Sequence, residues 1–105
     1  MTTDENNKIY YVYILLCKNG SYYTGYTTDI KRRYQEHLKG TAKSKYTRSF
    51  KVKKLAQCWE ILGLKSDAMK AENYIKKLSK KDKEYLILNP INLESLFKCS
   101  ILEQI

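Results

Sequence analysis

The strongest constraint on the fold is an apolar and aromatic run near the amino terminus that is followed at once by a tight-turn signal. Residues 9–17 read IYYVYILLC, and such a run of β-branched and aromatic side chains predicts a buried strand. Asn19-Gly20 is typical of a hairpin turn because both residues tolerate positive φ. Residues 22–26, YYTGY, predict the returning strand. Gly25 inside that strand indicates a bulge or a close backbone approach.

After the hairpin, the chain predicts helices around one further strand. Thr28 or Asp29 can cap a helix that runs to about Lys39, where Gly40 stops it. The remaining elements follow from period and capping signals: a basic loop over 41–51, a strand over 53–62, a helix from Ser66 to about Leu78, and a shorter helix from a Ser79–Asp82 capping box to about Leu88. We therefore expect an α+β fold with a small three-stranded antiparallel sheet that opens with a β-hairpin and is flanked by three or four helices.

The length of 105 residues fits one compact domain, which we place at 8–89. Residues 1–7 are polar and acidic, and we expect a disordered leader there rather than a targeting signal. Residues 90–105 form a C-terminal tail after Asn89-Pro90. Its apolar side chains fall on one helical face and predict a helix that docks on its own domain or on a second copy: Leu93, Leu96, Phe97 and Ile101.

Composition narrows the classes of partner and compartment. The net charge of +9 suggests a polyanionic partner without naming it. The three cysteines are isolated and there is one histidine, so we do not expect a structural zinc site. We expect the cysteines to be reduced, buried thiols. No apolar run approaches the ~20 residues that span a bilayer. We expect a soluble cytoplasmic protein with no membrane partner, either a monomer or a weak homodimer.

Basic residues are concentrated between positions 31 and 54, where ten lysines and arginines face one acidic residue, Glu36. Aromatic residues are interleaved with them. Cations neutralise phosphates and aromatic faces can stack on unpaired bases, so this segment is a candidate nucleic-acid surface. The candidate contacts are Arg32, Lys43, Lys45, Tyr46 and Arg48. A solvated basic face with ordinary packing aromatics is an equally valid interpretation from composition alone.

Polar groups also occur on helix faces that should turn toward the core. In the first helix, Ile30, Tyr34 and Leu38 define the inward face. Arg33 and His37 lie on or beside it. In the second helix, the inward face of Ala68, Ala71, Ile75 and Leu78 contains Glu72. A buried charge needs a partner, a phosphate or a metal. A buried Arg33–Glu72 pair or an outward Glu72–Lys76 pair would also explain these positions.

These features together make the sequence resemble the GIY-YIG nuclease superfamily, in particular its small stand-alone YhbQ-like (Slx-type) branch. Tyr11-Val12-Tyr13 stands where that family has Gly-Ile-Tyr, and Tyr23-Thr24-Gly25 stands where it has Tyr-Ile-Gly. Arg33 and His37 match the family's helix positions, Glu72 matches its metal-binding glutamate, and residues 42–48 resemble its basic loop. Two departures from the pattern matter: Tyr11 replaces a glycine, and Thr24 replaces an isoleucine.

The resemblance implies an activity and its residues. One divalent metal, Mg²⁺ or Mn²⁺, would be bound by Glu72, and Arg33 would hold the scissile phosphate. Tyr13 or Tyr23 would orient or deprotonate the attacking water. His37 would share the acid or base role, with a structural hydrogen-bonding role as the alternative. Lys45 and Arg48 would grip the nucleic-acid backbone.

We therefore expect a GIY-YIG-type endonuclease that hydrolyses phosphodiester bonds in DNA, with RNA left open as a substrate. Because 105 residues leave little room for a separate reader domain, we expect selectivity for structure rather than sequence, as suits repair or recombination. The alternative is a catalytically silent nucleic-acid-binding module of the same fold. A basic protein–protein adaptor is a third interpretation. Intact Arg33 and Glu72 favour the enzyme.

Overall fold

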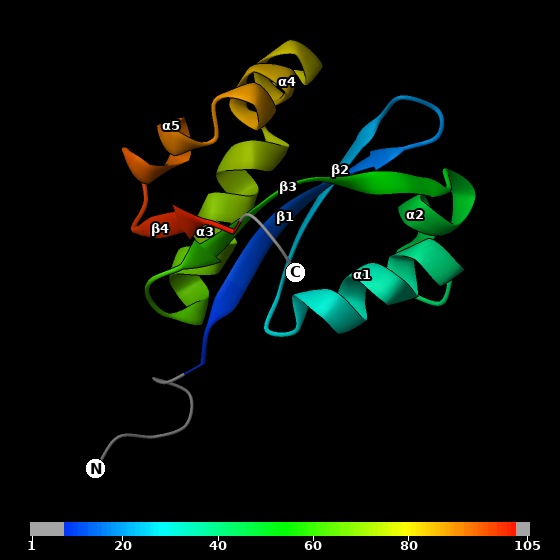
Figure 1. The fold of residues 1–105 in the computed structure, drawn as a ribbon, viewed down its shortest axis with the longest axis horizontal. Coiled ribbons are helices and arrows are strands. Elements are labelled where there is room, and N and C mark those ends of the chain that lie inside the picture. Colours follow the sequence, from blue (N-terminus) through cyan, green and yellow to red (C-terminus); the bar gives the residue numbers. More distant parts are fainter. Residues whose placement is uncertain (1–7, 103–105) are drawn as a thin grey trace.

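The computed structural model describes residues 8–102, and its centre is a four-stranded antiparallel sheet. The strands are β1 (Tyr10–Cys17), β2 (Tyr22–Thr27), β3 (Val52–Ile61) and β4 (Cys99–Ile101). Their order across the sheet is β2-β1-β3-β4, so β1 and β3 are central (Figure 1). The expected α+β fold is confirmed, but the sheet has four strands rather than three. The expected leader at residues 1–7 lies outside the described residues.

The hairpin between β1 and β2 forms where the turn signal predicted it. The turn is closed by the amide of Gly20, which donates to the carbonyl of Cys17 at 2.9 Å. Gly20 has φ of 88°, while no residue other than glycine has positive φ within 8–102. Asn19 therefore has negative φ in this turn. Gly20 is the turn residue that needs the positive φ that glycine readily adopts.

Within the described residues, five helices surround the sheet, one more than the upper limit that the sequence predicted. Their bounds are α1 (Ile30–Lys39), α2 (Lys45–Ser49), α3 (Lys65–Lys76), α4 (Lys80–Leu88) and α5 (Ile91–Glu94). Three of the expected caps are confirmed: Asp29 accepts from the amide of Arg32, Gly40 ends α1 with φ of 75°, and Ser79 accepts from the amide of Asp82. Ser66 is not a cap, because α3 begins one residue earlier and the Asp67 carboxylate accepts from the amide of Leu64 at 2.8 Å.

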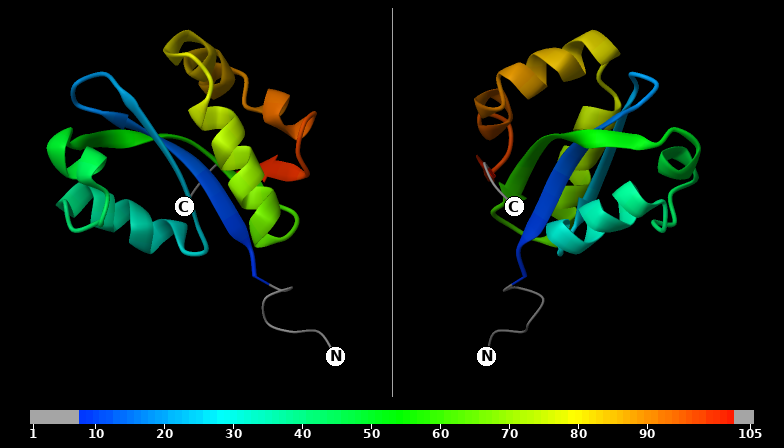
Figure 2. Two further views of the ribbon diagram at one scale, coloured as in Figure 1. Left: turned by 180° about the vertical axis from the view of Figure 1, so that it is seen from behind. Right: turned by 45° about the vertical axis from the view of Figure 1, so that its right-hand side comes forward.

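The helices divide between two cores on opposite faces of the sheet, as strand alternation requires. One core joins strand residues such as Val12 and Trp59 to α3, α4 and α5. The other joins Tyr13, Leu15 and Cys58 to α1. Figures 1 and 2 show α1 and α2 together at one end of the molecule and α5 with β4 at the other. Side chains from α1 and α3 can therefore approach each other only around the β2 edge or through the sheet.

The inward face of α1 differs from the expected one at its C-terminal end. Ile30 is buried and Tyr34 is half-buried, as predicted, but Leu38 is 42% exposed and His37 is only 2% exposed. A position seven residues after Ile30 lies closer to the same stripe than one eight residues after it. His37 can be buried at this position because both of its ring nitrogens form hydrogen bonds, one with Tyr13 and one with Thr47 on α2.

The expected basic loop contains the short helix α2. Ser44 caps it by accepting from the amide of Thr47 at 3.3 Å, a local signal that the lack of periodicity obscured. Thr47 is 1% exposed, so this one residue anchors α2, whose other side chains face solvent. On α3, the predicted inner face is confirmed for Ala68, Ala71 and Ile75, which are fully buried.

The expected C-terminal helix is wrong beyond its first turn. Residues 91–94 form α5, but Cys99–Ile101 form β4, which pairs with residues 59–61 of β3. Leu93 is fully buried, whereas Leu96 is 56% exposed, so the four apolar residues do not share one helical face. The backbone of β3 offers an open edge, and pairing with it satisfies hydrogen-bonding groups that a short isolated helix would leave exposed. Residues 103–105 lie outside the described residues.

The predicted state of the cysteines is confirmed. Cys17, Cys58 and Cys99 are all free and buried. Burial raises the pKa of Cys58 to about 12 and that of Cys99 to about 11. These thiols therefore stay protonated and act as small apolar core groups. None of the helices within residues 8–102 is long and apolar enough to cross a membrane.

The packing of the tail predicts a large cost for shortening Leu93. Leu93→Ala should lower the free energy of unfolding by roughly 2–5 kcal/mol, because it leaves a cavity in a fully buried position. Leu96→Ala, three residues away and 56% exposed, should change it by less than about 0.5 kcal/mol. Urea unfolding of both variants measures this difference. Equal, small effects would show that the tail does not contribute to the core.

Candidate active site

The candidate site is organised around Tyr13, whose ring crosses the hairpin and covers Gly25. The two residues are direct partners in the β1–β2 register. A Cβ atom added to Gly25 would lie 2.5 Å from the Tyr13 hydroxyl and 2.7 Å from Cζ. The predicted close approach at Gly25 is therefore confirmed, and its partner is a tyrosine ring. Only glycine leaves room for Tyr13 to extend toward α1.

A hydrogen-bonded series runs from Tyr13 through His37 to Thr47. The Tyr13 hydroxyl lies 3.0 Å from Nε2 of His37, and Nδ1 of His37 lies 2.9 Å from Oγ1 of Thr47. The Thr47 hydroxyl donates its proton to the carbonyl of Ser44 at 3.4 Å. Its oxygen therefore accepts a hydrogen bond from Nδ1–H of His37. Nε2 then accepts the Tyr13 proton. This assignment leaves the lone pairs of the Tyr13 oxygen free for a substrate or water.

The electrostatic environment keeps both groups of this pair neutral. Burial, followed by the positive charge of Arg33, lowers the pKa of His37 to about 4, although Glu36 partly opposes this. Burial also raises the pKa of Tyr13, and Tyr23 and Glu72 add to the increase while Arg33 opposes it. At neutral pH the site therefore holds a neutral imidazole beside a protonated phenol.

Tyr23 completes a ring cluster with this pair. Its ring centroid lies 5.3 Å from that of His37 and 6.5 Å from that of Tyr13. On its other side it stacks on Tyr46, with a centroid separation of 6.0 Å and an interplanar angle of 29°. Among residues 8–102 the Tyr23 hydroxyl has no hydrogen-bond partner. The structure thus brings together three predicted site residues, Tyr13, Tyr23 and His37.

Arg33 and Glu72 approach this cluster from different helices without pairing with each other. Arg33 Nε lies 3.4 Å from Glu36 on α1, and Glu72 lies 3.4 Å from Lys76 on α3. A buried Arg33–Glu72 pair is absent from the ion pairs of residues 8–102, so the outward Glu72–Lys76 alternative is the one observed. Both charges nevertheless act on the pKa of Tyr13, which Arg33 lowers and Glu72 raises.

Arg33 also carries an unsatisfied donor. Its Nε is buried, and its contact with Glu36 does not have hydrogen-bond geometry. No other buried side-chain nitrogen or oxygen within residues 8–102 lacks a hydrogen-bond partner. A buried donor left unpaired is costly, so an acceptor supplied by a ligand would be favourable at this position.

A hollow beside Arg33 is lined by cations. It has a volume of about 480 Å³, and its lining contains no acidic side chain. The lining residues are Lys8, Tyr10, Tyr26, Thr27, Thr28, Arg32, Arg33 and Lys65. Lys8 and Lys65 were not predicted as site residues, because they are far from Arg33 in the sequence and their regions carry no motif. Arg32 lies in this hollow and pairs with Asp29 at 3.5 Å.

The other predicted nucleic-acid contacts gather on and beside α2 instead. Lys45, Tyr46 and Arg48 are exposed on that helix, and Lys43 precedes its cap. Thr47, which holds His37, was missed because a threonine in a basic segment gives no distinctive signal. The predicted set thus divides between the cationic hollow and α2, and the Tyr13–His37–Tyr23 cluster contacts α2 through Thr47 and Tyr46.

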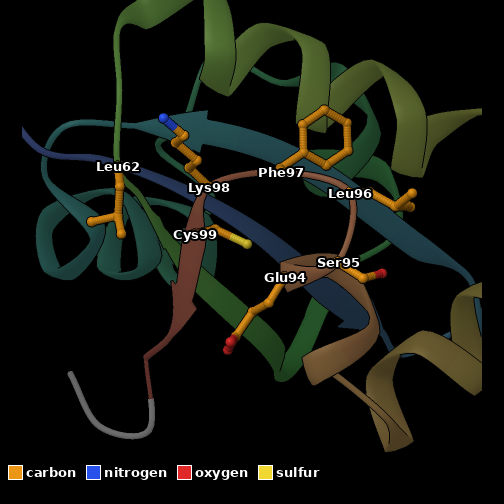
Figure 3. Close-up of a pocket in the computed structure, with 7 residues that line it drawn as sticks. All are labelled: Leu62, Glu94, Ser95, Leu96, Phe97, Lys98 and Cys99. Carbon is orange, nitrogen blue, oxygen red and sulfur yellow. The ribbon is translucent and has the colours of Figure 1, made fainter.

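A second hollow, at the β4 end of the molecule, has no part in this cluster. It measures about 370 Å³ and is lined by Leu62, Glu94, Ser95, Leu96, Phe97, Lys98 and Cys99 (Figure 3). Figure 3 shows Glu94 and Lys98 directed apart, and the Cys99 thiol is protonated at neutral pH. These groups do not form a convergent polar set, so the hollow is not a candidate active site.

The part of the chain that the structure describes contains no ready-made metal centre of several side chains. Within residues 8–102, no three histidine, cysteine, aspartate or glutamate side chains gather closely enough to hold a metal. The Glu72 side chain is 13% exposed, and its one ion pair is with Lys76. A metal at Glu72 would therefore take its other ligands from water and substrate. Mg²⁺ accepts such an arrangement because it retains several waters and binds phosphate oxygens.

Comparison with known proteins gives consistent matches along most of the chain. The family model described as the GIY-YIG catalytic domain matches residues 9–85. A UPF0213 protein of Enterococcus faecalis is 47% identical over 81 residues, which cover 76% of this chain and 91% of that protein. A UPF0213 protein of Halalkalibacterium halodurans is 46% identical over 78 residues, which cover 74% of this chain and 81% of that protein.

Two solved structures also resemble this chain. The solution NMR structure of the UPF0213 protein from Bacillus halodurans is 46% identical, covers 75% of this chain and 82% of its own, and has a TM-score of 0.49. The NMR structure of a protein from E. faecalis is 41% identical, covers 85% and 92% of the two chains, and has a TM-score of 0.48.

The lowered pKa of His37 predicts how stability depends on pH. Above pH 6.5 both the folded and the unfolded chain hold a neutral imidazole. As pH falls from 6.5 to about 4, the unfolded chain binds a proton that the folded state excludes, so the free energy of unfolding falls. The contribution of His37 to this loss should reach roughly 3 kcal/mol below pH 4.

His37→Gln, which cannot titrate, isolates that contribution. Urea unfolding of the wild type and the variant at several values between pH 7 and pH 4 should show the stability difference between them shrinking as the pH falls. A difference that stays constant across this range would contradict the burial of a neutral His37.

Proposed function

Because this chain belongs to the GIY-YIG catalytic domain family, a family of nucleases, we propose that it is a metal-dependent endonuclease that hydrolyses phosphodiester bonds in DNA. The observation that carries this proposal is the hydrogen-bonded Tyr13–His37–Thr47 series, together with two charged residues, Arg33 and Glu72, that act on the pKa of Tyr13. Phosphodiester hydrolysis needs a positioned water and relief of charge on the phosphate. This site has a group for each task.

Arg33 would hold the scissile phosphate. Its buried Nε lacks a hydrogen-bond partner, and a phosphate oxygen would satisfy it. A guanidinium can donate two parallel hydrogen bonds to a phosphate, which fixes its orientation and stabilises developing negative charge. The adjoining hollow, lined by Lys8, Arg32 and Lys65 without an acidic side chain, would accommodate the phosphates on one side.

Tyr13 would orient the attacking water. Its proton is donated to Nε2 of His37, so its oxygen presents lone pairs that can accept a hydrogen bond from water. Because its pKa is raised, Tyr13 is protonated at neutral pH. It would therefore position the water and would not act as a general base. Tyr23, whose hydroxyl has no partner within residues 8–102, would donate to a phosphate oxygen.

Glu72 would hold the metal, which we propose to be Mg²⁺ or Mn²⁺. Its carboxylate is largely buried, acts on the pKa of Tyr13 and has only an exposed lysine as its ion-pair partner. A divalent metal there supplies positive charge beside the phosphate and lowers the pKa of a coordinated water. The protein's own contribution is to present one carboxylate and leave the other coordination positions open.

Variants of the two charged residues test the catalytic assignment. Glu72→Gln keeps the shape and removes the charge that a metal needs, so metal-dependent cleavage should fall roughly hundredfold or more. Arg33→Ala should reduce cleavage similarly and also weaken DNA binding. Because Glu72 and Arg33 pair within their own helices, each change should cost less than about 1 kcal/mol of stability.

Lys76→Gln is the matched control, since it removes the ion-pair partner of Glu72 and leaves the carboxylate in place. It should retain cleavage. All three variants are compared with the wild type by cleavage of a labelled branched DNA and a linear DNA, with and without Mg²⁺. Melting temperature and DNA binding are measured for each. Wild-type cleavage by folded Glu72→Gln would sink the assignment, and binding without any cleavage in the wild type would favour a catalytically silent module.

The basic segment predicts strongly salt-dependent binding. The slope of log affinity against log salt should fall by about 1–2 in the double variant Lys45→Ala/Arg48→Ala, because each phosphate contact contributes about 0.9. Lys70→Ala/Lys77→Ala removes the same charge from exposed positions at α3 and is the matched control. Equal slopes for the two double variants would show that α2 is a solvated surface without a role in DNA binding.

A further inference from the structure

Two large aromatic rings lie exposed side by side on α2 and its C-cap. Tyr46 lies in α2, and Phe50, four residues later, is the C-cap residue that directly follows the helix. Their ring centroids are 5.0 Å apart, and their side chains are 38% and 42% exposed. We call this pair the α2 aromatic face. Adjacent exposed rings provide a surface on which another flat ring can stack.

The α2 aromatic face continues directly into the proposed active site. Tyr46 stacks on Tyr23 at 6.0 Å, and the ring of Tyr23 lies 5.3 Å from that of His37. A continuous series of rings therefore leads from the buried His37 to the exposed Phe50. A ligand ring that stacked at the outer end would be connected through these rings to His37, the hydrogen-bond partner of Tyr13.

The position of this face is fixed by the same hydrogen bonds that organise the site. Thr47, between the two rings in sequence, is 1% exposed and accepts from Nδ1 of His37 at 2.9 Å. Ser44 caps the helix and holds its first turn. The face therefore cannot swing freely with respect to Tyr13, as rings on a mobile loop could. Figures 1 and 2 show α2 seated against the C-terminal end of α1.

Charge identifies the kind of ligand. Lys45 and Arg48 are exposed on α2, and Lys43 and Lys51 flank it. No acidic residue occurs between His37 and Trp59 in the sequence. Cations around exposed rings suit a strand in which each base is joined to a phosphate, whereas an apolar peptide would gain nothing from the cations.

We infer that the α2 aromatic face is a stacking platform for an unpaired nucleobase, so that the enzyme prefers DNA that is single-stranded or frayed beside the cleaved bond. A paired base is already stacked within its duplex and does not offer a free face. This inference rests on the proposed function for the position of the cleaved bond. The stacking itself requires only binding, and it can be tested without cleavage.

The test measures binding in EDTA to a 12-nucleotide single strand and to the matching duplex, with 2-aminopurine in the single strand. Phe50→Leu and Tyr46→Leu keep apolar bulk and all charges. Each should lower the ratio of single-strand to duplex affinity roughly tenfold and reduce the 2-aminopurine quenching on binding, since a π-face has been lost. The salt slope should not change. Tyr46→Trp, which enlarges the ring, should retain the preference.

Tyr85→Leu is the matched control, because Tyr85 is 61% exposed on α4, far from α2 in the fold. It should leave the affinity ratio and the quenching at wild-type values. Either an unchanged ratio in both Phe50→Leu and Tyr46→Leu, or an equal loss for single strand and duplex, would overturn the inference. Loss of cleavage in Glu72→Gln with this ratio intact would support both proposals, while retained cleavage would refute only the proposed role of Glu72.

Discussion

The hydrogen bond between the Tyr13 hydroxyl and Nε2 of His37 is the contact on which the rest of the site depends. It joins the hairpin to α1, and through Nδ1 of His37 it reaches Thr47 and so holds α2. It can form only because Gly25 leaves space for the Tyr13 ring to cross β2. One missing side chain on a strand thus determines where two helices and a ring cluster lie.

The charged groups of the site come from both faces of the sheet. Arg33 is on α1 and Glu72 on α3, and these helices belong to different cores. Because each residue has its ion-pair partner within its own helix, neither charge neutralises the other. The two charges act in opposite directions on the pKa of Tyr13. In the proposed function, this separation would leave a cation available for the phosphate and a carboxylate available for the metal.

Local signals predicted much of this arrangement. The hairpin, the Asp29 and Ser79 caps and the inner face of α3 follow from short-range rules, and Arg33, His37 and Glu72 were notable because polar groups occupied inward positions. Features that depend on distant partners could not be read in this way. Leu38 loses its inward place because His37 has partners on β1 and α2, and β4 forms because β3 has an open edge. The departure at Tyr11 is tolerated, since Tyr11 pairs regularly with Thr27 and has no positive φ.

The reactivity of the buried cysteines can report local opening of the structure. Cys58 lies in the core beneath α1, and Cys99 lies in the core beneath α3 and α5. A thiol with raised pKa, shielded from solvent, reacts with an alkylating reagent only when the structure around it opens. The two sulfurs therefore report on two different halves of the fold. Alkylation of Cys58 reports opening of the half that carries the Tyr13–His37 contact, and alkylation of Cys99 reports opening of the half that carries the tail. No label has to be introduced.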